Sequence, residues 1–80
     1  MINMEFDAAQ DAFRAGELTE AVVSSDDERN GWVIMVRRRG AGLEPITDTR
    51  GEPRVYHQLD HASELARRIG FRQVRIEEPF

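Results

Sequence analysis

Hydrophobic positions near the start of the chain recur at the spacing of one helix face. They are Ile2, Phe6, Ala9 and Phe13, which lie four, three and four residues apart. This pattern predicts an amphipathic helix over residues 4–15. Asn3 suits the cap before the first turn, and Gly16 suits the position after the last turn. The polar face of this helix carries mostly acidic residues.

A second helix is predicted over residues 59–69. Its apolar residues also fall at helical spacing, and they are Leu59, Ala62, Leu65, Ala66 and Ile69. Gly70 follows at the position where glycine ends a helix. We expect Leu65 to face a sheet, close to Ile34 or Val36.

The remaining apolar runs are short and rich in β-branched and aromatic residues, which is typical of strands. Five strands are predicted, over residues 19–24, 32–38, 44–49, 54–57 and 71–77. Residues 25–31 and 50–53 have the composition of turns. The prediction is a single α+β domain over residues 1–80 with element order α-β-β-β-β-α-β. An antiparallel sheet and one helix on its face form the core (17–80), preceded by the acidic helix (1–16).

The two strands at the centre of this sheet carry apolar side chains on both faces. Val22 and Val23 are adjacent, and residues 32–36 are all apolar. A sheet with one face in water alternates more strictly between apolar and polar positions. Both faces are therefore expected to be covered near the centre. Helix 59–69 covers one face, and either helix 4–15 or a second copy of the chain covers the other.

Length and composition limit how this core is stabilised. A chain of 80 residues builds a thin core, and without cysteine it forms neither a disulfide nor a thiolate metal site. Self-association is the remaining common source of stability. The start of the chain lacks a basic and apolar leader, and no apolar run approaches the roughly 20 residues that cross a bilayer. The protein is expected to be soluble, cytoplasmic and free of membrane contact.

The net charge of −4 is unevenly distributed. Residues 1–28 hold eight acidic residues and one arginine, whereas residues 29–80 hold ten arginines and seven acidic residues. Because alternate residues of a strand share a face, Arg37 and Arg39 are expected side by side, with Arg54 at the start of a following strand. These three arginines are the predicted contacts for nucleic-acid phosphate or for an acidic partner. The acidic sequence pI of about 5.1 favours the alternative, in which they are solvated or ion-paired.

No catalytic, metal or cofactor site is predicted. His57 and His61 have the spacing of a zinc-binding pair, but His57 precedes the helix and no third ligand is close in sequence. The acidic run 26–28 lacks the alternating spacing of a calcium loop. The serines lie outside any G-x-S-x-G motif. The chain is therefore expected to be non-enzymatic, with no cofactor and no small-molecule substrate.

Three short patterns together resemble a known group of proteins. They are G-W-V-I-x-V-R over 31–37, T-x-T-R-G-x-x-R-x-Y over 47–56, and L-D-x-A-x-x-L over 59–65. This combination resembles small plasmid-partition-associated proteins carried on plasmids and integrative elements of proteobacteria, and it covers residues 31–77. The resemblance brings no functional residues with it. It implies a non-enzymatic accessory protein of mobile DNA that acts by protein–protein contact, with weak contact to DNA as a further expectation.

A second resemblance concerns the arrangement of residues 32–69. A basic three-stranded sheet followed by a helix is similar to the arm-DNA-binding domain of phage-type integrases, which contacts the major groove through arginines. The net acidity and the additional final strand depart from that family. The alternative to both resemblances is a pure protein-interaction or dimerisation module, inhibitor-like or antitoxin-like, that contacts its partner through the acidic helix and binds no nucleic acid.

Overall fold

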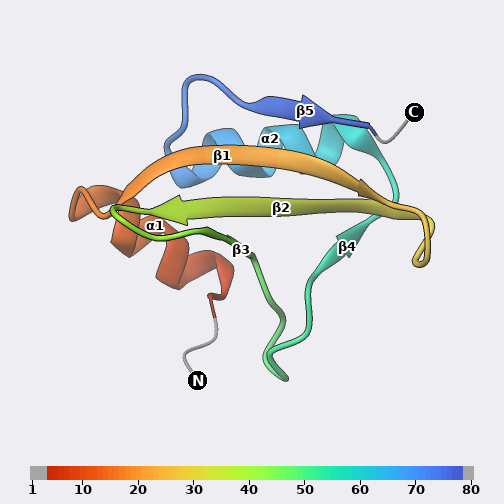
Figure 1. Cartoon of the computed structure of the whole chain (residues 1–80), viewed down its shortest axis with the longest axis horizontal. Coiled ribbons are helices and arrows are strands. Elements are labelled where there is room, and N and C mark those ends of the chain that lie inside the picture. The colour runs from red at the N-terminus through yellow and green to blue at the C-terminus, as the bar shows by residue number, and fades with distance from the viewer. Residues whose placement is uncertain (1–3, 79–80) are drawn as a thin grey trace.

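The computed structural model describes residues 4–78, which form two helices and five strands (Figure 1). The helices are α1 (Phe6–Arg14) and α2 (Leu59–Ile69). The strands are β1 (Leu18–Asp26), β2 (Gly31–Arg38), β3 (Leu43–Pro45), β4 (Val55–Tyr56) and β5 (Arg75–Glu77). The α+β class and the element order predicted from the sequence are confirmed. Neither helix is long and apolar enough to cross a membrane.

The ends of both helices follow from local sequence. Glycine follows each helix, with a φ of 77° at Gly16 and of 138° at Gly70, where a side chain would be strained. After α1, the N–H groups of Gly16 and Glu17 donate to the carbonyls of Phe13 and Ala12, which closes the last turn. The predicted cap, Asn3, and the first apolar position, Ile2, lie outside the described residues.

The sheet is mixed, which corrects the predicted antiparallel sheet. The strands β1 and β2 form a long antiparallel hairpin, and β3 and β4 both pair with β2 in antiparallel orientation. On the opposite edge, β5 pairs with β1 in parallel. The reason is that α2 connects β4 to β5. A helical crossover returns the chain to the same end of the sheet, so the strands before and after it run parallel.

Strands β3, β4 and β5 are shorter than predicted, and β4 is shorter by one residue at each end. The predicted strand 44–49 is reduced to β3 and an isolated bridge between Thr47 and Pro53. Pro45 has no N–H to extend the ladder. The residues before β5 bend away from β1, so that only 75–77 of the predicted strand 71–77 are paired.

Asp48 organises the turn between β3 and β4. Its Oδ1 accepts hydrogen bonds from the backbone N–H groups of Arg50 at 2.8 Å and Glu52 at 3.1 Å. These two hydrogen bonds hold the pKa of Asp48 below its ordinary value of 3.8. The bond from the Glu52 N–H has the larger effect and the bond from the Arg50 N–H has the smaller one. This carboxylate therefore stabilises the fold above pH 3.8, and the contribution is lost as the pH falls through the lowered pKa.

We expect Asp48→Asn to be less stable than the wild type at pH 7, because the neutral amide accepts these hydrogen bonds more weakly. Urea titration at a series of pH values would measure the difference. It should close as the pH falls below 3.8, the ordinary pKa of the carboxyl. Glu52→Gln removes one negative charge from the same turn and is the control. A difference that persists unchanged into acid would contradict the role given to Asp48.

Both helices pack on the same face of the sheet. The buried cluster on that face joins Ala9 and Ala12 of α1 with Ala62, Ala66 and Ile69 of α2 and with Ala21, Val23, Ile34 and Val36 of the sheet. The rings of Phe13 and Phe71 meet edge to face at 4.9 Å. In Figure 1, β1 passes in front of α2, and the segment leading into β3 passes in front of α1. Of the two predicted coverings of the second face, helix 4–15 is therefore wrong, and a second copy of the chain stays a prediction.

Small side chains bring α2 close to the sheet. Ala62 and Ala66 are fully buried, whereas Leu65 is only partly buried and packs against the margin of the core. Leu65 lines a hollow together with Phe6 and Tyr56. We therefore expect the buried alanines and Ile34, rather than Leu65, to dominate the packing of α2 on the sheet.

Candidate interaction surface

The face of the sheet that carries no helix is here named the open face. Strand alternation and pairing register place eleven side chains on it, namely Glu20, Val22, Ser24, Val33, Met35, Arg37, Leu43, Pro45, Val55, Arg75 and Glu77. Figure 1 looks onto this face, with the strands side by side. The two helices lie on the opposite side of the sheet.

The centre of the open face is apolar. Val22 is 1% exposed and Val33 is 6% exposed, although neither belongs to the core that the helices cover. Around them, Met35, Leu43, Pro45 and Val55 are half-buried, and none of these packs against that core. No helix covers this apolar centre.

One margin of this apolar centre is a row of ion pairs. Arg37 Nε lies 3.1 Å from Glu20 Oε1, and Arg75 Nη1 lies 3.3 Å from Glu20 Oε2. Arg75 Nη2 is also 3.0 Å from Glu77 Oε1. The row holds two arginines and two glutamates and thus has no net charge. Each exposed pair contributes little to stability, but together they leave no single-sign patch on this margin.

The turn between β1 and β2 lies at the opposite margin of the apolar centre. Residues 26–29 line a hollow of about 410 Å³ together with Val33, Met35, Pro45 and Pro53. Asp26 is held by Arg29, whose Nη1 lies 3.5 Å from its Oδ2. Within residues 4–78, Asp27 and Glu28 form no ion pair. The turn therefore presents two uncompensated negative charges beside the apolar centre.

The three arginines predicted from the sequence do not form one surface. Arg37 lies on the open face in the row of ion pairs. Arg39 lies in the turn after β2, and its Nε donates to the Gly16 carbonyl at 2.7 Å. Arg54 lines a hollow with the acidic residues Glu5 and Asp7 at the start of α1. The third arginine of the run, Arg38, is held by Glu17 at 3.1 Å and by Glu44 at 3.2 Å.

Strand β2 ends at Arg38, so Arg39 lies beyond the strand and does not share the open face with Arg37 as expected. The hollow beside Arg54, of about 380 Å³, also contains the Thr47 hydroxyl, which is buried with no hydrogen-bond partner in the described residues. Burial raises the pKa of Tyr56 in the same hollow. The hollow is lined by both acidic side chains and an arginine, so it favours no ligand of one charge.

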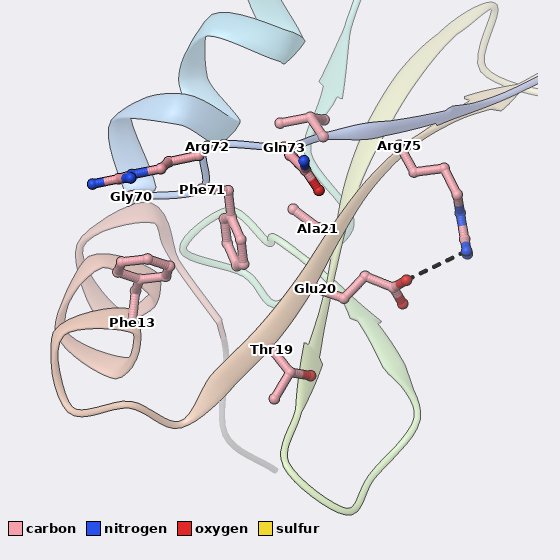
Figure 2. A pocket seen from close by; sticks show the side chains of 10 residues that line it. Phe13, Thr19, Glu20, Ala21, Gly70, Phe71, Arg72, Gln73 and Arg75 are labelled. Atoms are coloured by element: carbon pink, nitrogen blue, oxygen red, sulfur yellow. Dashed lines mark ion pairs between the residues drawn. The ribbon is translucent and has the colours of Figure 1, made fainter.

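A larger hollow of about 950 Å³ separates β1 from residues 70–75 (Figure 2). It exists because β5 pairs only with residues 22–24 of β1, and the sequence alone did not indicate it. Figure 2 shows the Phe71 ring and the Gln73 side chain facing this hollow, whereas Arg72 points away from it. Its carboxylate, Glu20, is already held by Arg37 and Arg75. The polar side chains that line this hollow therefore do not point to a common position where a ligand could bind.

The two histidines, His57 and His61, do not form a shared site. His61 packs edge to face against Tyr56 with ring centroids 5.5 Å apart, and His57 lines a different hollow beside Trp32. In the part of the chain that the structure describes, no three acidic or histidine side chains are placed to hold a metal ion.

No family model, no curated protein and no solved structure matches the chain. The resemblances to plasmid-partition-associated proteins and to integrase arm domains therefore stay predictions. The geometry of the open face is what remains to indicate a function.

Proposed function

We propose that this chain is a non-enzymatic domain that acts by protein–protein contact and that its contact surface is the open face of the sheet. The observation that carries the proposal is a set of half-buried apolar side chains, Met35, Leu43, Pro45 and Val55, which surround the buried Val22 and Val33 on a face that carries no helix. A mainly apolar centre inside a polar margin is the usual composition of a protein interface.

The acidic helix is a weaker contact surface. Its apolar side chains Ala9, Ala12 and Phe13 are already used in the core or packed against it. Its outer surface offers exposed charges such as Asp11, which pairs with Arg14 at 2.7 Å. Exposed charges of this kind add little binding energy without an apolar centre beside them. The open face offers both an apolar centre and a polar margin.

Contact with DNA, an accessory role on mobile DNA and a cytoplasmic location stay predictions. Two of the three arginines in the run 37–39 are held by carboxylates, and Arg54 lies beside acidic residues of α1. Phosphate would have to displace those carboxylates to bind the same guanidinium groups. The electrostatics of the described residues thus support protein contact better than DNA contact.

A photo-cross-linking amino acid at position 35, in the middle of the open face, would test the proposal in cells that carry the gene. We expect it to form protein adducts on irradiation, and mass spectrometry would identify them. The matched control places the same group at position 11, on the outer surface of α1, where we expect no adducts. Adducts from position 11 alone, or from neither position, would overturn the open face as the contact surface.

A further inference from the structure

We propose that the hollow beside the turn between β1 and β2 binds a basic side chain, arginine or lysine, that the partner protein presents between apolar residues. This inference rests on the proposed function and names the chemistry of the partner. The hollow, here named the hairpin hollow, has a volume of about 410 Å³ and is formed by residues 24–29 together with Val33, Met35, Pro45 and Pro53. The aliphatic stem of the bound side chain would lie on the apolar residues, and its cationic head would lie at Asp27 and Glu28.

The part of the lining that comes from β2, β3 and Pro53 is apolar. Met35 of β2 lies opposite Pro45 of β3 in the strand register. Val33 is 6% exposed, whereas Met35, Pro45 and Pro53 are half-buried. The volume of the hairpin hollow falls within the range of about 300–1,000 Å³ that is usual for ligand pockets. There is therefore room for a long side chain on an apolar surface.

The part of the lining that comes from the turn is acidic. Asp26, Asp27 and Glu28 line the hairpin hollow with a single arginine, Arg29. Asp26 already holds that arginine, since its Oδ2 lies 3.5 Å from Arg29 Nη1 and its Oδ1 accepts from the Arg29 backbone N–H at 3.2 Å. Asp27 and Glu28 have no ion-pair partner among residues 4–78. Three carboxylates and one guanidinium leave a net charge of −2 on the lining itself.

The neighbouring parts of the open face do not offset this charge. The row of ion pairs at the other margin has no net charge. Residues 48–54, which include Pro53, hold two acidic residues and two arginines. A positive charge brought into the hairpin hollow is therefore attracted, whereas the phosphate groups of nucleic acid or of an anionic lipid are repelled.

A basic side chain matches both parts of this lining. Arginine and lysine combine an aliphatic stem, which lies on apolar surface, with a cationic head that stays near water. In the described residues, no three acidic or histidine side chains are placed to hold a metal ion, so the two carboxylates favour an organic cation. Apolar residues on either side of the bound residue would meet the rest of the apolar centre. The expected partner segment is thus a basic residue flanked by apolar ones.

Nuclear magnetic resonance titration of the full chain with capped tripeptides tests the inference. The probe has arginine between two valines, and its matched control has citrulline, which has nearly the same shape without the charge. We expect the arginine peptide to shift the backbone N–H signals of residues 27, 28, 33 and 35. The citrulline peptide should bind about three- to fivefold more weakly, the size of an exposed ion pair, and the difference should shrink as salt rises. No shift at those residues with millimolar peptide, or equal affinity for the two peptides, would overturn the inference.

Neutral variants locate the charge that the peptides detect. Asp27→Asn with Glu28→Gln should remove the preference for arginine over citrulline. Both residues are exposed in the turn, and Asp26 keeps its contacts with Arg29, so the fold should persist. The control, Asp60→Asn with Glu64→Gln, removes the same charge from the exposed surface of α2 and should leave the preference unchanged. An equal loss of preference in both double variants would show a general effect of net charge and overturn the hairpin hollow as the site.

Cross-linking from position 35, which lines the hairpin hollow, extends the test to the partner in cells that carry the gene. We expect the attached segment to hold arginine or lysine next to the point of attachment. Asp27→Arg with Glu28→Arg should lower the yield of the adduct about threefold or more, whereas Asp60→Arg with Glu64→Arg should not.

The outcomes separate this inference from the proposed function. Adducts whose yield is indifferent to charge reversal at 27 and 28 would overturn the basic side chain and leave the open face as the contact surface. The same holds for an attached segment without a basic residue, whether it comes from a second copy of the chain or from another protein. No adduct at position 35 would overturn both.

Discussion

Replacing Ile34 with alanine is expected to lower the free energy of unfolding by about 2–5 kcal/mol, the usual cost of truncating a fully buried aliphatic side chain. Ile34 is 0% exposed and lies on the helix side of β2, opposite Val23 of β1. Its carbonyl accepts a hydrogen bond of 2.8 Å from the N–H of Ile46, another side chain with 0% exposure. The cavity would therefore open where both helices, the central hairpin and the segment after β3 meet.

Urea titration at one fixed protein concentration measures the loss, since association would otherwise shift the apparent stability. Total stability of a small domain is only about 5–15 kcal/mol, so the alanine variant could be largely unfolded. Ile34→Val removes one methylene group and provides a graded control, with an expected loss of about 0.5–1.5 kcal/mol. A loss below about 1 kcal/mol for Ile34→Ala would show that the core is not centred at this residue.

Replacing Gly70 with alanine is expected to cost about 2–4 kcal/mol, because two unfavourable effects coincide there. The φ of 138° is one that residues with a side chain rarely adopt. A Cβ atom at this position would also overlap the Phe13 ring, whose Cδ1 and Cε1 atoms would both lie closer than any real contact. The ring packs against Phe71 and links α1 to the chain that follows α2. The substitution should therefore loosen the contact between the two helices.

Gly16→Ala is the matched control for this substitution. Gly16 also has a positive φ, of 77°, but a Cβ atom there would meet nothing within 4 Å. It should cost only about 1 kcal/mol, from the backbone conformation alone. Combining Gly70→Ala with Phe13→Ala should cost less than the sum of the two single changes, since removing the ring removes the overlap. Equal losses for Gly16→Ala and Gly70→Ala would show that the ring does not constrain Gly70.

The parts of the fold predicted well are those that depend on residues close in sequence. Helix α2 occupies the predicted residues 59–69, because its apolar spacing and Gly70 determine both its face and its end. The apolar run 32–36 correctly indicated a central strand. Strand β3 was predicted too long, since Pro45 and the hydrogen bonds of Asp48 interrupt pairing in a way that composition alone does not show.

The candidate site was predicted only in part. The adjacent valines 22 and 23 correctly showed that apolar side chains point to both faces of the sheet. The arginines were judged by strand alternation alone, which does not reveal that Glu20 and Glu44 lie close enough to pair with Arg37 and Arg38. Glu20 and Arg37 are 17 residues apart and meet only because the hairpin register places them opposite one another.

By itself, the sequence determined the class of the domain, the order of its elements, and the presence of a sheet with two apolar faces, because spacing and turn residues act over a few positions. Only the tertiary structure decided which face each helix covers and which strands become neighbours. An amphipathic helix such as α1 has an apolar side that can pack against any apolar surface. The contact of Phe13 with Phe71 places α1 beside α2, and the crossover through α2 makes β5 parallel to β1. That choice leaves Val22 and Val33 without a covering layer and so creates the open face.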